Sequence, residues 1–72
     1  MMTQKQMVID YIKNFGSITP MEAFSDLGIT KLATRVSELR RNGERIVKKM
    51  ENGKNRFGRK IRYARYCFEQ EE

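Results

Sequence analysis

The chain has 72 residues, a net charge of +6, one cysteine and no histidine. A chain this short buries only about 60% of its unfolded surface, which excludes a large core or a substrate cleft with a catalytic scaffold around it. Without histidine, neither a credible zinc ligand set nor a Ser-His-Asp or Cys-His catalytic set is possible. We therefore expect no enzymatic activity, no metal, no cofactor and no small-molecule substrate.

The charge is unevenly distributed along the chain. Residues 1–30 carry a net charge of −1, residues 31–65 carry thirteen Lys/Arg against three Glu, a net +10, and residues 66–72 carry −3. A positive block of this size favours a polyanionic partner, and a solvated basic surface that aids solubility is the alternative. The cations are not confined to one amphipathic helix, so no membrane partner is expected. A single cysteine and an amino terminus without a signal-peptide core predict a cytoplasmic location.

The first expected helix spans about residues 4–14. Thr3 with Gln6 has the form of a capping box at its start, and Gly16 can supply the left-handed residue that follows its end. Five apolar residues recur at helical spacing and predict its buried stripe: Met7, Val8, Tyr11, Ile12 and Phe15.

A second expected helix spans residues 20–27. Thr19 can cap it, Pro20 suits the first helical position, Glu22 completes a capping box, and Gly28 follows its end. The three residues before Pro20 predict a small strand or an extended link. Three side chains of the helix are expected to face inward: Ala23, Phe24 and Leu27.

A third expected helix spans about residues 31–41, within the segment GITKLATRVSELRRNG (28–43). Thr30 is its expected cap and Gly43 its stop. Ile29 is expected to enter the core, and Ala33 is small enough to let a neighbouring helix approach. Three residues at i, i+4 and i+7 predict the buried side: Leu32, Val36 and Leu39.

The remaining segment, about 44–69, predicts an antiparallel hairpin. Residues 44–50 and 60–69 favour strands, and residues 51–59 have the glycines and asparagines of a long, basic loop. The alternation of apolar with polar residues along the second strand changes phase between Tyr63 and Ala64, which predicts a bulge there. Its aromatic residues (Tyr63, Tyr66 and Phe68) are expected to pack on the helices rather than stack on bases. Residues 1–72 thus form one mainly α domain with a small β-hairpin, a winged helix-turn-helix with three helices and a two-stranded wing.

The unburied side of the third helix predicts a DNA-reading surface. Arginine binds guanine through two hydrogen bonds, a carboxylate accepts one from cytosine N4, and threonine contacts either base edge or the thymine methyl group. The alternative is a solvated face on which Glu38 lies beside Arg41 at i+3. The candidate recognition residues are Lys31, Thr34, Arg35, Ser37, Glu38 and Arg41.

The wing and the start of the second helix provide candidate contacts to the DNA backbone or minor groove. A basic loop that protects the hairpin edge from aggregation is the alternative. Phe57 in this loop could fold back on the core, which we favour, wedge at a base step, or contact a protein. The candidate backbone residues are Ser17, Thr19, Lys54, Asn55, Arg56, Arg59, Lys60 and Arg62.

The run SITPMEAFSDLGITKLATRVSELRRNGERI (17–46) resembles the small helix-turn-helix domains encoded by bacteriophages and prophages. In these, a T-x-x-E-A…GI-x-x-L-a-x-R-i-x-x-L-R-x-x-G pattern precedes a short wing. The resemblance implies a double-stranded DNA-binding regulator of transcription or recombination in the bacterial host cytoplasm, with Lys31, Thr34, Arg35 and Glu38 facing DNA. It implies structural roles for Thr19, Pro20, Glu22, Ala23, Gly28, Leu32, Leu39 and Gly43.

Three other partners stay open. A second copy of the chain would give a dimer or a cooperative array, because one small domain reads few base pairs. A host protein, bound or inhibited by the domain, is the main rival to DNA. Single-stranded nucleic acid is a weaker one.

Overall fold

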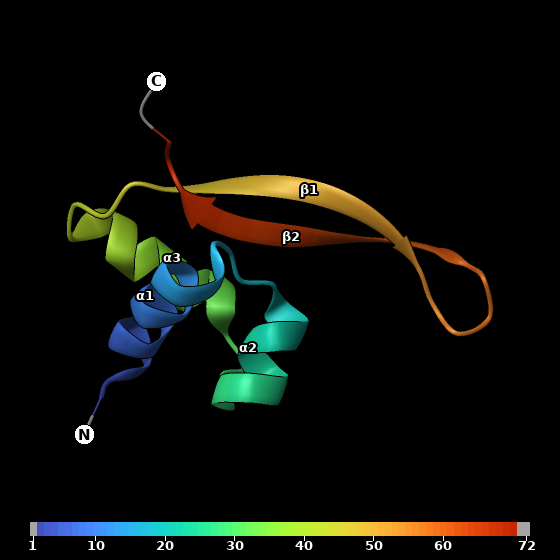
Figure 1. Ribbon diagram of the computed structural model, residues 1–72, viewed down its shortest axis with the longest axis horizontal. Coiled ribbons are helices and arrows are strands. Elements are labelled where there is room, and N and C mark those ends of the chain that lie inside the picture. The colour runs from blue at the N-terminus through green and yellow to red at the C-terminus, as the bar shows by residue number, and fades with distance from the viewer. Residues whose placement is uncertain (1, 71–72) are drawn as a thin grey trace.

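The computed structural model describes residues 2–70 and contains five elements in chain order. These are α1 (Gln4–Phe15), α2 (Pro20–Leu27), α3 (Leu32–Arg41), β1 (Ile46–Lys54) and β2 (Lys60–Phe68). The helices form one body, and the β1–β2 hairpin passes over α2 and extends beyond it (Figure 1). The expected fold class, three helices plus a two-stranded antiparallel hairpin, is confirmed. The polar chain end, residues 70–72, predicts fraying, and of these Glu71 and Glu72 lie outside the described residues.

Local capping sets where α1 and α2 begin. At α1, Thr3 Oγ1 accepts a hydrogen bond from the Gln6 amide at 3.2 Å, and Gln6 Oε1 accepts one from the Thr3 amide at 2.8 Å. Thr19 and Glu22 repeat this reciprocal pair at α2, at 3.2 and 2.9 Å. Both expected capping boxes are confirmed, so two otherwise unpaired amides are satisfied at each helix start.

The start of α3 differs from the expectation. The N-cap is Lys31, whose side chain makes no capping hydrogen bond, so the prediction of a Thr30 cap was wrong. The preceding turn explains the shift. The amides of Gly28 and Ile29 donate to the Phe24 and Ala23 carbonyls, each at 3.0 Å, and Ile29 is buried as expected. These bonds hold residues 28–29 to the end of α2, and the chain enters the next helix one residue later.

The core lies between the three helices and the base of the hairpin. Its buried apolar residues are Val8, Tyr11, Ile12, Ile18, Ala23, Ile29, Leu32, Val36, Leu39, Ile46 and Tyr66. Ile18 forms the short extended piece expected before α2, because its amide and carbonyl pair with Tyr66 of β2.

Two expected core positions are exposed, and the expected close approach at Ala33 is not made. Phe15 is 71% exposed because it lies in the last turn of α1, where it contacts the ring of Tyr11 at 4.6 Å between centroids. Phe24 is 60% exposed, because α2 has only eight residues and buries Ala23 fully and Leu27 partly. Ala33 is also exposed, so no helix packs closely over it.

The hairpin pairs residue for residue from Ile46–Phe68 to Lys54–Lys60, so the predicted bulge was wrong. β1 starts two residues later than expected and runs four residues farther toward the tip, whereas β2 covers almost the expected residues. The connecting loop therefore contains only residues 55–59. The apolar residues of β2 fall into two alternating sets because both faces of this strand lie against other parts of the protein. Ala64, Tyr66 and Phe68 face the helical core, whereas Ile61 and Tyr63 line a cavity beside the start of α2.

Among residues 2–70, no helix is both long enough and apolar enough to cross a membrane.

Candidate nucleic-acid interface

The two sides of α3 are clearly divided. Leu32, Val36 and Leu39, which are at most 3% exposed, hold the helix on the core. The six candidate recognition residues lie outside this buried side. Lys31, Thr34, Ser37 and Arg41 are exposed, and Arg35 and Glu38 are half-buried. The helix can therefore offer a polar surface to a partner without losing its packing.

Arg35 and Glu38 form an ion pair on this surface. Arg35 Nε lies 3.0 Å from Glu38 Oε1, but the two atoms lack the alignment of a hydrogen bond. Glu38 thus pairs with the arginine three residues before it, whereas the sequence suggested Arg41, three residues after it. The approach of the two side chains is through Nε, and no side-chain hydrogen bond among the described residues involves the terminal guanidinium nitrogens of Arg35. Those nitrogens are the pair that reads guanine bidentately.

Arg40 joins α3 to the wing, a role that the sequence reading missed. Its Nε donates a hydrogen bond to the carbonyl oxygen of Ile46 at 2.9 Å. This bond connects the last turn of the helix to the first residue of β1. The available signal was a basic residue in the last turn of a helix, where such side chains often bind nearby carbonyls.

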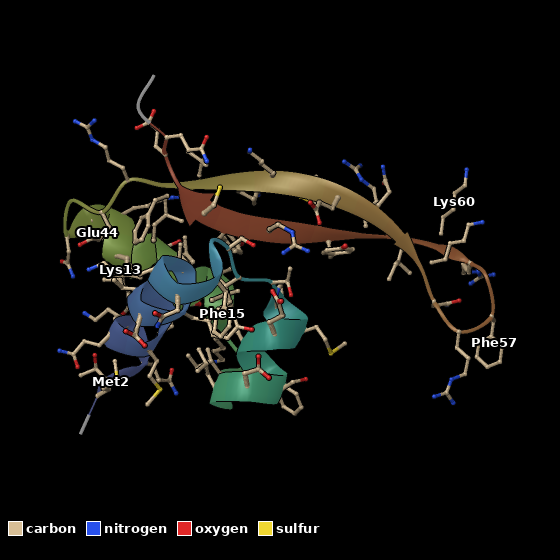
Figure 2. The ribbon with its side chains drawn as sticks, viewed as in Figure 1. Met2, Lys13, Phe15, Glu44, Phe57 and Lys60 are labelled. Carbon is tan, nitrogen blue, oxygen red and sulfur yellow. The ribbon has the colours of Figure 1, made fainter. Side chains whose placement is uncertain are left out.

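The wing tip carries the second group of candidates. Lys54, Asn55, Arg56, Arg59, Lys60 and Arg62 are all exposed. Figure 2 shows Lys60 and Phe57 at the far end of the hairpin, away from the helices. Asn55 has a structural task there, because its Oδ1 accepts from the amides of Phe57 at 2.9 Å and Arg59 at 3.0 Å. The structure therefore places five exposed cations around one hydrogen-bonded loop.

Phe57 does not fold back on the core, as we had favoured. Its side chain is 89% exposed. The hydrogen bonds to Asn55 close the loop and turn residue 57 away from the strands, and Gly58 allows this with a φ of 77°. The two other interpretations, a wedge at a base step and a protein contact, stay open.

Arg65 anchors the middle of the wing to the helical body. Its Nε donates to Glu51 Oε1 at 2.7 Å, and its Nη1 donates to Ser17 Oγ at 2.9 Å and lies 3.8 Å from Glu22 Oε1. The hydrogen bond from Arg65 lowers the pKa of Glu51, and the same bond raises the pKa of Arg65. The sequence reading missed this role. Its signal was the diagonal position of Glu51 and Arg65 across the strand pair, visible only once the register is known.

The polar groups at the start of α2 are largely used within the protein. The Thr19 side chain is only 5% exposed, and its hydroxyl caps the helix. The Ser17 hydroxyl accepts the hydrogen bond from Arg65. Glu22 adds a carboxylate at this helix start, which disfavours a phosphate there. The geometry supports structural roles for Ser17 and Thr19 more than direct phosphate contacts.

Tyr11 and Asp26 connect α1 to α2, on elements that carry no recognition candidate. The Tyr11 hydroxyl donates to Asp26 Oδ2 at 2.5 Å. This hydrogen bond, followed by burial and the charges of Glu22 and Asp26, raises the pKa of Tyr11 to about 12. The bond helps to fix α2, and through the α2–α3 turn it helps to fix α3.

Comparison with known proteins agrees with this geometry. A family model described as a winged helix-turn-helix domain matches residues 3–71, from the first capping box to beyond the last strand. Searches of curated proteins and of solved structures gave no match. The family's fold is a DNA-binding one and is typically without enzymatic activity, which suggests DNA as the partner. The chain therefore belongs to the winged helix-turn-helix domain family.

Proposed function

We propose that the protein binds duplex DNA with α3 in the major groove and the basic wing on the backbone or in the minor groove. The observation that carries this proposal is the placement of charge: thirteen of the fifteen Lys/Arg lie in residues 31–65, on α3, the wing and their connection. Such a surface attracts a polyanion such as DNA, and binding releases the counterions condensed on the DNA phosphates. The resemblance noted above supports a role as a phage or prophage regulator of transcription or recombination in the host cytoplasm.

The candidate residues have different roles in this proposal. Arg35 reads a base edge through its terminal nitrogens, while Glu38 holds the guanidinium and offers an acceptor to cytosine N4. Lys31, Thr34, Ser37 and Arg41 complete the groove surface. The cations of the wing bind phosphates, and Ser17 and Thr19 support the wing and α2. Because one domain reads few base pairs, copies of the chain bind as dimers or cooperative arrays.

Selection of bound sites from a random duplex library tests the proposal, and two variants then separate the roles. At a selected site, Arg35→Ala costs about 1–3 kcal/mol of binding free energy, whereas on unrelated duplexes it costs less. Lys54→Ala weakens all sequences to a similar extent, because it removes a phosphate contact. The control is Lys13→Ala, which removes an exposed cation from α1 and leaves the affinity unchanged. Equal losses for Arg35→Ala and Lys54→Ala on every duplex would contradict base reading by Arg35.

A second candidate function is a protein-interaction module that binds or inhibits a host protein. The observation that favours it is the apolar outer side of α2, where Met21 is 72% and Phe24 is 60% exposed. Met21 also lines a cavity of about 450 Å³ between α2 and β2, together with Ile61 and Tyr63. Capture of a host protein from nuclease-treated lysate, abolished by a Met21→Ala, Phe24→Ala double variant, supports this function if no duplex is enriched. Competition between duplex and single-stranded probes tests the remaining nucleic-acid alternative.

A further inference from the structure

Phe57 is the most exposed large apolar side chain among the residues that the structure describes. It is 89% exposed, compared with 72% for Met21 and 71% for Phe15. Burial of an aromatic side chain is among the largest favourable contributions to protein stability. A ring held fully in water at the tip of the wing therefore contributes nothing to the fold and is available to a partner.

The loop presents this ring in a defined way. The Asn55 amide donates to the Arg59 carbonyl at 2.9 Å, and the Gly58 amide donates to the Asn55 carbonyl at 3.0 Å. Asn55 Oδ1 accepts from the amides of Phe57 and Arg59. Four hydrogen bonds thus close a five-residue loop, with Phe57 at its outer end (Figure 2). Since a closed loop has little freedom left to lose, a partner can bind the ring at a low entropic cost.

The surroundings of the ring indicate the chemistry of that partner. Lys54, Arg56, Arg59 and Lys60 lie around it, and residues 52–68 contain no Asp or Glu. A ring surrounded by cations fits a surface that is anionic outside and apolar inside. The base stack of DNA, with a phosphate backbone on each side of its groove, has this composition. Exposed wedges of this kind unstack base steps from the minor groove and bend the duplex by about 20–90°.

Resting on the proposed duplex binding, we infer that Phe57 is a wedge that enters a base step from the minor groove and kinks the DNA. The surrounding cations hold the two backbones while the ring separates the bases. Pyrimidine–purine steps unstack most easily, so the wedge adds a preference for TA or CA/TG at a fixed distance from the site of α3. The protein then acts as a DNA-bending protein as well as a DNA-binding one.

The test uses the full chain and an end-labelled duplex that contains a selected site. Energy transfer between the ends reports the bend, and 2-aminopurine at the step under the wing tip reports unstacking. The wild type is expected to raise both signals on binding. Phe57→Ala is expected to shift the duplex in a gel but to lose both signals, and Phe57→Leu, which keeps an apolar wedge, to retain most of the bend. Phe15→Ala is the control, since it removes another exposed ring, 71% exposed, at the end of α1, away from the wing tip (Figure 2).

The outcomes distinguish this inference from the proposed function. Bound wild type without a bend, or an equal bend with Phe57→Ala, overturns the wedge and leaves duplex binding intact. Absence of duplex binding overturns both. If Phe57 is then required for binding to vesicles that contain phosphatidylserine, or for capture of a host protein, the ring serves that other surface and the wedge is rejected.

Discussion

Replacement of Thr19 by valine tests whether the start of α2 is a structural cap or a phosphate contact. Valine keeps the shape and the methyl group of threonine and removes the oxygen that accepts from the Glu22 amide. The residue is only 5% exposed and its backbone is extended, at φ −111° and ψ 162°, so a β-branched side chain fits there. The variant therefore isolates the loss of one capping hydrogen bond.

The magnitude follows from the capping geometry and the size of the chain. Loss of a threonine cap costs about 1 kcal/mol, within a range of about 0.5–2 kcal/mol. For a domain of this size, 1 kcal/mol corresponds to a change in Tm of about 4–8 °C. We therefore expect the Tm of Thr19→Val to fall by about that amount, and the Tm of Thr19→Ser, which keeps the oxygen, to fall less.

Two measurements on each variant are needed. Thermal unfolding followed by far-ultraviolet circular dichroism gives the Tm, and duplex affinity is measured well below the transition at one fixed salt concentration. The affinity of Thr19→Val is expected to equal that of the wild type, because the hydroxyl is not available to a phosphate. An unchanged Tm together with a weakened affinity would refute the structural role of Thr19.

Two further predictions concern pH. The folded pKa of Tyr11, about 12, lies above the ordinary value of 10.0, so the stability from its bond to Asp26 is complete below pH 10 and is lost as the pH rises through about 12. A spectrophotometric titration should show one tyrosine that ionises at higher pH than the others. This high-pH step should be absent in Tyr11→Phe and should move to lower pH in Asp26→Asn. A high-pH step that persists in Tyr11→Phe would contradict the assignment. The pKa of Glu51 is lowered from its ordinary value of 4.5 by the bond from Arg65, so its contribution is present above pH 4.5 and is lost as the pH falls through the lowered value. Urea unfolding across this acid range should give a steeper decline for the wild type than for Glu51→Gln, and equal declines would show that the bond adds no stability.

The starts of α1 and α2 could be predicted because their signals are local. A capping box involves two residues three positions apart, and both boxes form as expected. The start of α3 could not be predicted in the same way. Thr30 is a good capping residue, but the burial of Ile29 and its hydrogen bond to Ala23 decide where the chain leaves the turn. A tertiary contact thus overrides a local preference.

The hairpin shows a second limit of sequence reading. A change in the phase of alternation has two explanations, a bulge or a strand with partners on both faces. The pattern of β2 is compatible with both, and only the position of α2 beside Ile61 and Tyr63 decides for the second. Arg65 was underestimated for the same reason, because its three partners come from β1, α2 and the segment before α2.

The division of α3 into a buried and an accessible side could be predicted from its spacing alone, as Leu32, Val36 and Leu39 show. The pairing on the accessible side could not. Glu38 has an arginine three residues before it and another three residues after it, so spacing does not choose between them. The structure pairs it with Arg35, the residue to which we assign base reading.

The salt dependence of duplex binding tests the central claim most directly. If the exposed cations of α3 and the wing neutralise about six phosphates, the logarithm of the association constant falls with the logarithm of salt concentration at a slope of about −5. Lys54→Ala should reduce the steepness of this slope by about one, because one phosphate contact is lost. An association with duplex DNA that does not weaken as salt is raised would contradict the claim.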